Sequence, residues 1–275
     1  MSNSQKIAVA LCIYKNDKLD FVKLSIDSIL SQESCDFDLL IQVDGLVEPS
    51  VYDYLQSIKG ISNIFIFFNS NNMGLAYRLN QIIEYSISPK VYGFIARMDA
   101  DDIAMPNRLK TQVDFLNENE DISVVGSDVM EISESGHNIF YKKMESNSEL
   151  ISKNIIRKCP LNHPSVMFRI SIFCDSDLRY KPDLMNTQDY YLWVDIINRG
   201  FNISNINQPL LKFRVDNKFH SRRGLSKSIN EFKSRMYAMN KLDCYTFSNI
   251  LHTFLLLGLR LSPSFLKKFA YSKLR

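Results

Sequence analysis

The first 130 residues alternate short apolar runs with segments of helical periodicity, and this alternation constrains the fold more than any other feature. Apolar runs of strand length occupy residues 7–13, 37–43, 64–68, 91–98 and 122–132. Between them, apolar residues recur at helical spacing near residues 21–30, 49–59, 75–86 and from Pro106 onward. Strands that alternate with helices form a mostly parallel sheet with helices on both faces. We therefore predict an α/β fold.

The second half of the chain is less regular. It predicts short strands at residues 165–168 and 210–215, a helix at 190–197 and an amphipathic helix at 226–242. No linker separates these segments. We expect one body over residues 1–220 and a helical, basic region over residues 221–275.

Charge is distributed unevenly along the chain. Residues 212–275 hold 14 Lys and Arg against 3 Asp and Glu, whereas residues 1–211 hold 19 against 27. An asymmetry of this kind suggests an anionic partner at the basic end. The hydrophobic content of 45% excludes a disordered chain. Five scattered cysteines without a CxxC pair, and no secretory leader, predict a cytoplasmic protein without a disulfide framework or zinc cluster.

Three carboxylates lie within four residues, directly after the predicted strand 91–98. They belong to Asp99, Asp101 and Asp102. In open α/β sheets ligands bind at the carboxyl ends of the strands, and clustered carboxylates favour Mg²⁺ or Mn²⁺. Such an ion could neutralise a substrate diphosphate. The alternative is a solvated acidic turn that caps the helix opening at Pro106. The position at the end of a strand favours the metal site.

Residues 95–109 (IARMDADDIAMPNRL) resemble the signature of family 2 glycosyltransferases with the nucleotide-diphospho-sugar (GT-A) fold, above all those of bacterial O-antigen and capsule clusters. Five further segments resemble family motifs in the same order: residues 10–17, 41–45, 72–80, 162–169 and 187–193. The resemblance covers residues 6–216. It implies a GT-A fold, which is a Rossmann-like mixed, mainly parallel sheet flanked by helices, here with a helical C-terminal appendage.

The resemblance also implies roles for individual residues. Asp101 would be the principal metal ligand, joined by Asp99, which would also face the ribose or the diphosphate. Asp44 would accept hydrogen bonds from the base, with Tyr14 near the uracil face. The residues implied to contact the nucleotide or the donor sugar are Cys12, Tyr14, Asp44, Arg78, Asp99, Asp102 and Arg222.

Asp189 would be the general base that deprotonates the acceptor hydroxyl, because an inverting transfer needs one base opposite the leaving nucleotide. The chain departs from the family at Gln188, where a Glu is usual, and at Val43, where the first Asp of a pair is frequent. The motif that usually closes the domain is altered at residues 213–216. Arg222, with His220 and Arg223, would form a flap over the diphosphate, or else a solvated basic loop.

Other prominent residues have simpler interpretations. His163 is expected to shape the acceptor pocket, since a lone His makes a poor metal site. Trp193 is expected in the core. Residues 247–261 are apolar, and residues 265–275 mix Lys and Arg with aromatic residues. That mixture suits an anionic membrane surface, or alternatively a helix docked on the body. No nucleic-acid-binding module is recognisable.

These observations lead to one functional expectation. The resemblance implies a metal-dependent inverting transferase that moves Glc, Gal or an N-acetylhexosamine from a UDP-sugar to an undecaprenyl-diphosphate-linked oligosaccharide in O-antigen biosynthesis. The enzyme would lie at the cytoplasmic face of the cell membrane, attached through its basic tail. Alternatives are a dTDP- or GDP-sugar donor, a non-catalytic sugar-nucleotide-binding or polysaccharide-binding protein with the same fold, and a membrane-surface scaffold.

Overall fold

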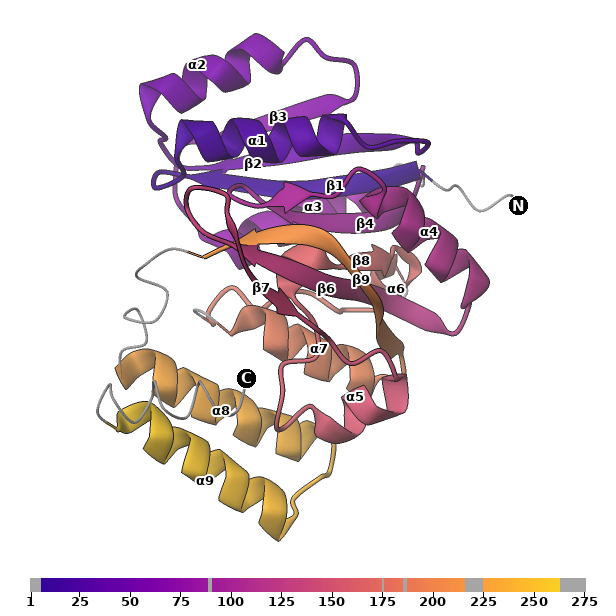
Figure 1. Ribbon diagram of the computed structural model, residues 1–275, viewed down its shortest axis with the longest axis vertical. Helices are drawn as coiled ribbons and strands as arrows, with labels where there is room; N and C mark the ends of the chain where they lie inside the picture. Colours follow the sequence, from indigo (N-terminus) through magenta and orange to yellow (C-terminus); the bar gives the residue numbers. More distant parts are fainter. Residues whose placement is uncertain (1–5, 89–90, 175, 185–186, 216–224, 263–275) are drawn as a thin grey trace.

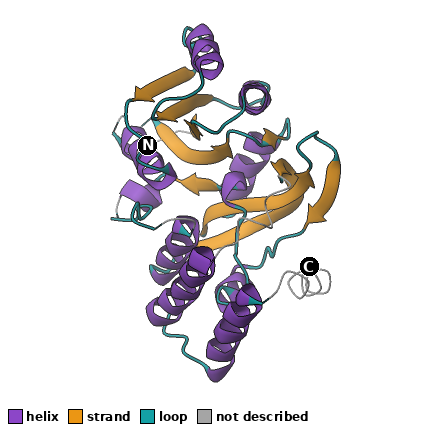
Figure 2. Ribbon diagram, turned by 90° about the vertical axis from the view of Figure 1, so that its left-hand side faces the viewer, coloured by secondary structure: helices purple, strands orange, loops and turns teal. Residues whose placement is uncertain are grey.

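The computed structural model describes residues 6–88, 91–174, 176–184, 187–215 and 225–262 (Figure 1). Its centre is a nine-stranded sheet with the strand order β3-β2-β1-β4-β8-β6-β9-β5, and β7 pairs with β6 beside this path. Helices pack on both faces of the curved sheet, and a pair of helices follows at one end (Figure 2). This is the mixed α/β architecture that the alternating sequence pattern predicts.

The first half of the chain forms four parallel strands with their connecting helices. In order these are β1 (Lys6–Tyr14), α1 (Leu19–Leu30), β2 (Phe37–Asp44), α2 (Pro49–Ile58), β3 (Ile64–Asn69), α3 (Leu75–Ile87) and β4 (Tyr92–Asp99). In the register of the sheet Cys12 lies opposite Asp99, and Tyr14 lies opposite Asp44. The carboxyl ends of β1, β2 and β4 therefore meet along one edge of the sheet, where the sequence places its polar motifs.

Two cores lie on opposite faces of this sheet because successive side chains of a strand alternate between faces. Ile7, Val9 and Leu11 of β1 enter the core beneath α1 and α4, whereas Ala8 and Ala10 enter the core beneath α3 and α7. All five side chains are buried. Burial on both faces explains why these strands read as unbroken apolar runs in the sequence.

The second half adds antiparallel pairings to the sheet. β8 runs antiparallel to both β4 and β6, while β6 and β9 are parallel to each other. The elements are β5 (Ile103–Ala104), α4 (Arg108–Glu118), β6 (Ile122–Ile132), β7 (Asn138–Lys142), α5 (Ser148–Asn154), η1 (His163–Ser165), β8 (Met167–Arg169), α6 (Ser171–Cys174), α7 (Gln188–Asn198) and β9 (Asn202–Arg214).

β9 begins eight residues before the predicted strand 210–215, and its polar first half explains the difference. Asn205 lies in this half, and its side-chain amide donates to the backbone oxygens of Glu145 and Pro160 over 2.7 and 3.0 Å. Ser204 donates to the backbone oxygen of Ser146. Because these polar side chains bind a neighbouring loop, the strand lacks the apolar run by which the other strands are recognised.

The C-terminal helices α8 (Leu225–Lys241) and α9 (Phe247–Leu261) form an antiparallel hairpin that packs against α7. Glu231 and Arg260 pair across the hairpin at 3.0 Å. Arg235 of α8 donates to the backbone oxygen of Ile155 and lies 4.3 Å from the ring centroid of Tyr190. The fold therefore includes the expected helical appendage, docked on the sheet domain. Among the described helices, none has both the length and the hydropathy needed to cross a membrane.

Candidate active site

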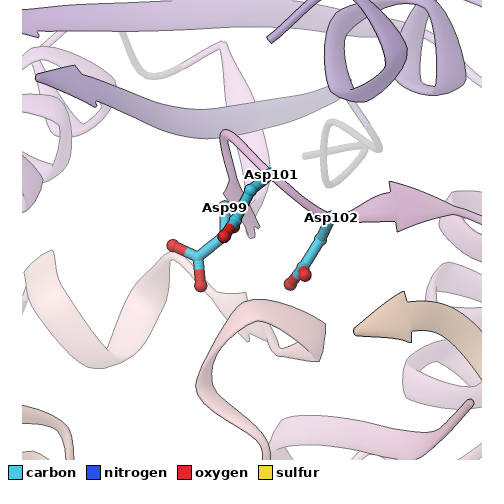
Figure 3. A group of neighbouring side chains, drawn as sticks. All are labelled: Asp99, Asp101 and Asp102. Carbon is cyan, nitrogen blue, oxygen red and sulfur yellow. The ribbon is translucent and has the colours of Figure 1, made fainter. Parts of the chain in front are cut away.

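Residues 99–102 (Asp-Ala-Asp-Asp), called the DADD segment below, bring three carboxylates together at the end of β4. Asp99 is the last residue of β4, and Asp101 and Asp102 lie in the turn before β5. One oxygen of each carboxylate lies within 4.8 Å of the others (Figure 3). The carboxylates do not cap α4, because that helix begins at Arg108 with no side-chain hydrogen bond at its N-cap. The geometry is that of a hard-oxygen donor set, which suits Mg²⁺ or Mn²⁺.

Arg97 is the counter-ion of Asp99. Residues 97 and 99 lie two apart in β4, so their side chains share one face of the sheet. The Arg97 guanidinium, whose side chain is 2% exposed, forms an ion pair with Asp99. Burial lowers the Arg97 pKa, but Asp99 and other neighbours raise it by more, so the guanidinium stays charged. The sequence analysis did not single out Arg97, although a charged residue inside an apolar strand was a visible signal.

Asp102 is completely buried and fastens the DADD turn to the end of β9. Its Oδ1 accepts a hydrogen bond of 2.8 Å from the backbone N–H of Arg214, whereas its Oδ2 has no hydrogen-bond partner. Burial, followed by repulsion from Asp99 and Asp101, raises its pKa well above the ordinary value. An unpartnered buried carboxylate oxygen beside two more carboxylates fits a cation site.

The Arg214 guanidinium holds backbone carbonyls together. Its Nε donates to the Asp101 oxygen over 2.8 Å, and its Nη1 donates to the oxygens of Ser133 and Glu134. It also lies 4.2 Å from the ring centroid of Phe21. Arg214, the last residue of β9, therefore holds the turn that carries Asp101 and Asp102 in place. Arg222, together with His220 and Arg223, lies outside the described residues.

A fourth carboxylate, which the sequence analysis did not assign to the site, approaches from the turn after β1. Asp17 Oδ2 accepts the backbone N–H of Tyr14 over 2.8 Å. Burial, and to a smaller extent the charges of Asp101 and Asp99, raise the Asp17 pKa to about 7, although the hydrogen bond from Tyr14 lowers it. Burial, then Asp99, raises the Asp101 pKa to about 6. The parallel pairing of β1 with β4 was the available signal, because it makes the two turns neighbours.

Asp44 and Arg78 meet in a buried ion pair of 2.7 Å between Oδ1 and Nε. Asp44 also accepts the backbone N–H groups of Met73 and Gly74, each over 2.8 Å. Gly45 follows with a φ of +85°, and a Cβ there would lie 3.1 Å from the Asn72 nitrogen. The structure thus brings two predicted nucleotide-binding residues together and ties the end of β2 to the start of α3 and to the loop before it.

The two other residues expected at the nucleotide pocket flank this pair on β1. Tyr14 lies opposite Asp44 in the sheet and is exposed, so its ring is available to a ligand. Cys12 lies opposite Asp99, and burial raises the pKa of its thiol to about 12. The thiol is therefore neutral and contributes no charge to the site.

Asp189, the residue expected to act as the general base, lies in the first turn of α7. Burial raises its pKa, while the N–H groups of Tyr190 and of its own backbone, then Arg97 and Lys227, lower it. Lys227 belongs to α8, so the C-terminal hairpin adds positive charge near Asp189. The neighbouring Gln188 has a buried Oε1 without a hydrogen-bond partner.

His163 and Trp193 belong to one packed cluster of aromatic side chains, in which the His163 ring contacts both Tyr180 and Trp193. Trp193 is fully buried, as predicted. His163 Nε2 is 2.8 Å from the Tyr180 hydroxyl, and burial lowers the His163 pKa well below its ordinary value. A neutral, enclosed His does not suit a metal ligand of this site. Asn80 holds Tyr180 in place through two backbone hydrogen bonds, which ties α3 to the same cluster.

Arg97 connects the two acidic parts of the site. Its charge lowers the pKa of Asp101 and Asp102 and also that of Asp189. A buried cation close to both sets of carboxylates reduces the repulsion between them. The arrangement can hold a cation at one end and keep a single carboxylate ready to accept a proton at the other.

The sequence of this chain is similar to those of known proteins. Residues 9–179 match the glycosyl transferase family 2. The chain is 31% identical to the Escherichia coli O-antigen biosynthesis glycosyltransferase WbnJ, over 86% of this chain and 93% of that protein. It is 27% identical to the E. coli UDP-Gal:alpha-D-GlcNAc-diphosphoundecaprenol beta-1,3-galactosyltransferase, over 98% of this chain and 97% of that protein.

Solved structures agree on the fold. The crystal structure of S. aureus TarS 1–349 in complex with UDP superposes with a TM-score of 0.63 at 14% identity, covering 89% of this chain and 74% of that one. The fold is therefore GT-A, as the sequence motifs imply. Since the family match spans well over half of the chain and includes the DADD segment, the chain belongs to glycosyl transferase family 2.

Proposed function

We propose that this protein is a metal-dependent inverting glycosyltransferase of O-antigen biosynthesis. It would move Glc, Gal or an N-acetylhexosamine from a UDP-sugar to a hydroxyl of an undecaprenyl-diphosphate-linked oligosaccharide. One observation carries the proposal: a carboxylate cluster lies at the end of β4, and a separate, half-buried carboxylate, Asp189, is close enough to Arg97 for the charge of that guanidinium to act on both. The E. coli relative that transfers galactose from UDP-Gal to alpha-D-GlcNAc-diphosphoundecaprenol supports the class of donor and acceptor, and WbnJ supports O-antigen biosynthesis.

The donor half of the site is the edge formed by β1, β2 and β4. Asp101 and Asp99 would hold Mn²⁺ or Mg²⁺, which when bound supplies positive charge for the leaving diphosphate. Asp102 would complete the cluster on the side of the donor sugar while it holds the turn on β9. Tyr14 and Cys12 of β1, with the Asp44–Arg78 pair, would line the nucleotide pocket.

The acceptor half is the start of α7. As the acceptor oxygen attacks the anomeric carbon, Asp189 accepts the hydroxyl proton, and the bond to the UDP oxygen breaks with its electron pair going to the diphosphate. Attack from the face opposite the leaving group inverts the configuration. Because burial raises the pKa of Asp189, its carboxylate is a stronger base than an exposed Asp.

The acceptor class determines where the enzyme would act. A lipid-linked oligosaccharide lies at a membrane, so we place the protein in the cytoplasm, peripherally at the inner face of the cell membrane. The basic residues of the region 221–275 support attachment to an anionic surface. Much of that basic charge belongs to residues 263–275, which lie outside the described part of the chain.

Transfer assays test the proposal with a panel of UDP-, dTDP- and GDP-sugars, a synthetic lipid-diphosphate acceptor, and Mn²⁺ present or absent. We expect Asp101→Ala and Asp189→Asn each to reduce transfer by about 100-fold or more. Asp114→Asn is the matched control, because Asp114 forms a half-exposed ion pair with Lys110 on α4 and has no part in the proposed site. Full activity in either site variant would refute the assignment.

A non-catalytic sugar-nucleotide-binding or polysaccharide-binding protein is the second candidate. It is favoured by Gln188, which stands beside Asp189 with an unpartnered Oε1. UDP-sugar binding measured by calorimetry, without transfer to any acceptor in the panel, would support this candidate over the enzyme.

A further inference from the structure

Helix α9 carries a row of exposed apolar side chains on the side that faces away from the protein. Phe247 is 82% exposed, Leu255 63% and Phe254 56%. Leu251 and Leu261 are also exposed. The intervals of four, seven, eight and fourteen residues from Phe247 bring all five to one side of a helix. Large apolar side chains that gather on one exposed face mark an interaction surface.

The opposite side of α9 is already occupied by α8. Thr253 is buried there, and Arg260 pairs with Glu231 at 3.0 Å. Phe254 lies at the edge of the exposed row, where its ring centroid is 5.3 Å from that of Phe232 in α8. Arg260 is the single Lys, Arg, Asp or Glu residue within the bounds of α9, and it points into the hairpin contact rather than onto the exposed face. The exposed face is therefore uncharged.

Positive charge near the exposed face of α9 indicates that the partner bound there is anionic. From residue 244 onward the sequence contains five Lys and Arg and no Asp or Glu. Lys233 and Lys241 of α8 are exposed as well. A second copy of the chain would bring two positively charged segments together, which is unfavourable. An anionic lipid surface offers both an apolar layer for the helix face and negative headgroups for the flanking Lys and Arg.

We propose that the exposed face of α9 lies in the headgroup region of an anionic membrane and anchors the protein there. A membrane anchor would serve the proposed function because the proposed acceptor is lipid-linked, and to that extent it rests on that function. The apolar face supplies the insertion, and the basic residues supply attraction to the surface.

The hairpin connects this membrane face to the site. Glu231 and Phe232 of α8 contact Arg260 and Phe254, so the second half of α9 lies beside the first half of α8. The first half of α8 also carries Lys227, whose charge acts on Asp189. Anchoring α9 would therefore hold the acceptor side of the site close to the lipid surface that carries the acceptor.

Vesicle co-sedimentation of the full chain tests the anchor without any need for activity. The wild type is expected to bind vesicles of phosphatidylglycerol and phosphatidylethanolamine, and to bind pure phosphatidylcholine much more weakly. Phe247→Ser/Phe254→Ser/Leu255→Ser should weaken binding to the anionic vesicles at least about tenfold, because three apolar side chains no longer enter the lipid. A Phe254→Trp reporter should show a blue-shifted emission on the same vesicles.

The matched control is Leu24→Ser/Val91→Ser/Ile139→Ser. It replaces three apolar residues that are comparably exposed elsewhere on the body, with Ile139 at 56% like Phe254. It should bind vesicles as the wild type does. Circular dichroism of both triple variants checks that they are folded.

Three outcomes would overturn the anchor. The α9 variant could bind anionic vesicles as tightly as the wild type, the wild type could fail to bind them, or sedimentation velocity could show a wild-type dimer that the α9 variant loses without any vesicle binding. Vesicle binding without transfer to any acceptor would instead overturn the proposed function and leave the anchor standing. Retained transfer by the α9 variant to a short-chain, detergent-soluble acceptor would confirm that the anchor and the chemistry are separable.

Discussion

Folded proteins usually keep charged groups at the surface and apolar groups in the core, and two regions of this molecule do the opposite. One is the edge of the sheet that carries the DADD segment, called the DADD edge here, and the other is helix α9. The edge buries charge: Arg97, Asp102 and Arg108 are all enclosed, although charged residues are rarely buried without partners. Helix α9 exposes apolar surface, with Phe247 and Leu255 largely uncovered. Burial of the Asp102 carboxylate and exposure of the α9 side chains each have a free-energy cost in the isolated chain, which a bound cation and a lipid surface respectively would offset. We therefore propose one ligand site at each region.

The two regions also differ in how firmly they are held. The edge is fixed by Arg97 on Asp99, by the Arg214 N–H on Asp102 and by Arg214 on three backbone carbonyls. The exposed row of α9 makes few contacts on its outer side. Changes at the edge should accordingly alter stability and ligand affinity together, whereas changes on α9 should alter membrane binding alone.

The largest effect is expected at Arg97. Arg97→Met leaves Asp99 beside Asp101 and Asp102 without its buried counter-ion, which should lower the free energy of unfolding by about 3 kcal/mol in urea titrations. Arg97→Lys keeps the charge and should recover part of the loss. Lys110→Met breaks the exposed Lys110–Asp114 pair and should change stability by less than about 1 kcal/mol. Equal losses at Arg97 and Lys110 would contradict the contrast.

Metal affinity should depend steeply on pH. Carboxylates ligate a divalent ion only when deprotonated, and burial raises the pKa of Asp101 to about 6 and of Asp17 to about 7. Calorimetry of Mn²⁺ with UDP present should therefore show full affinity near pH 8. Affinity should fall by about tenfold per pH unit below about 6.

Two variants assign this dependence. Asp17→Asn should flatten the part of the profile near pH 7, and Asp114→Asn should leave the whole profile unchanged. An affinity that does not vary between pH 5 and 8 would show that Asp101 is not a ligand and that the charge of Asp17 does not act on the metal site.

Asp102→Asn should stabilise the protein at high pH in the presence of a chelator. The folded-state pKa of Asp102 lies above its unfolded value, so the ionised carboxylate lowers stability as pH rises above about 4. Asn keeps an oxygen for the Arg214 N–H and removes the charge. We expect a gain of about 1 kcal/mol at pH 8, absent near pH 4, in urea titrations. A loss of stability at pH 8 would mean that the carboxylate charge itself is needed for the turn.

The smallest effect on stability is expected on α9. Phe247→Ser and Leu255→Ser should each change the free energy of unfolding by no more than about 0.5 kcal/mol, since neither side chain is covered in the folded chain. Ala238→Ser on the buried side of α8 provides the contrast, because it adds a hydroxyl to a closed position. A large loss from Leu255→Ser in urea titrations would show that the row is covered by the protein itself.

Much of the fold was predictable from the sequence because its signals are local. The five predicted strands of the first 132 residues all form, with bounds that differ by two residues or fewer from the predicted ones. β9 was underestimated and β5, β7, α5 and α6 were not predicted, because their sequences are short or polar. In these elements pairing with neighbours, rather than an apolar run, determines the conformation.

The site was predictable only where a motif lies in one segment. The carboxylates of the DADD segment were identified from their spacing, and the structure brings them together. The sequence suggested Asp44 and Arg78 separately, but their ion pair joins positions 34 residues apart. Asp17 and the counter-ion role of Arg97 were missed, because each depends on which strands are neighbours. The roles of Asp101 and Asp189 in transfer stay predictions that the proposed assays test.

The sequence by itself determined that this chain forms a mainly parallel α/β sheet, that its carboxylates end a strand, and that it resembles family 2 glycosyltransferases. Periodicity and contiguous motifs are properties of the chain that survive without tertiary contacts. The tertiary structure alone decided which Arg compensates which Asp, and which side of α9 remains uncovered. Burial and charge compensation depend on groups far apart in the sequence, and only the packed fold brings those groups within reach of one another.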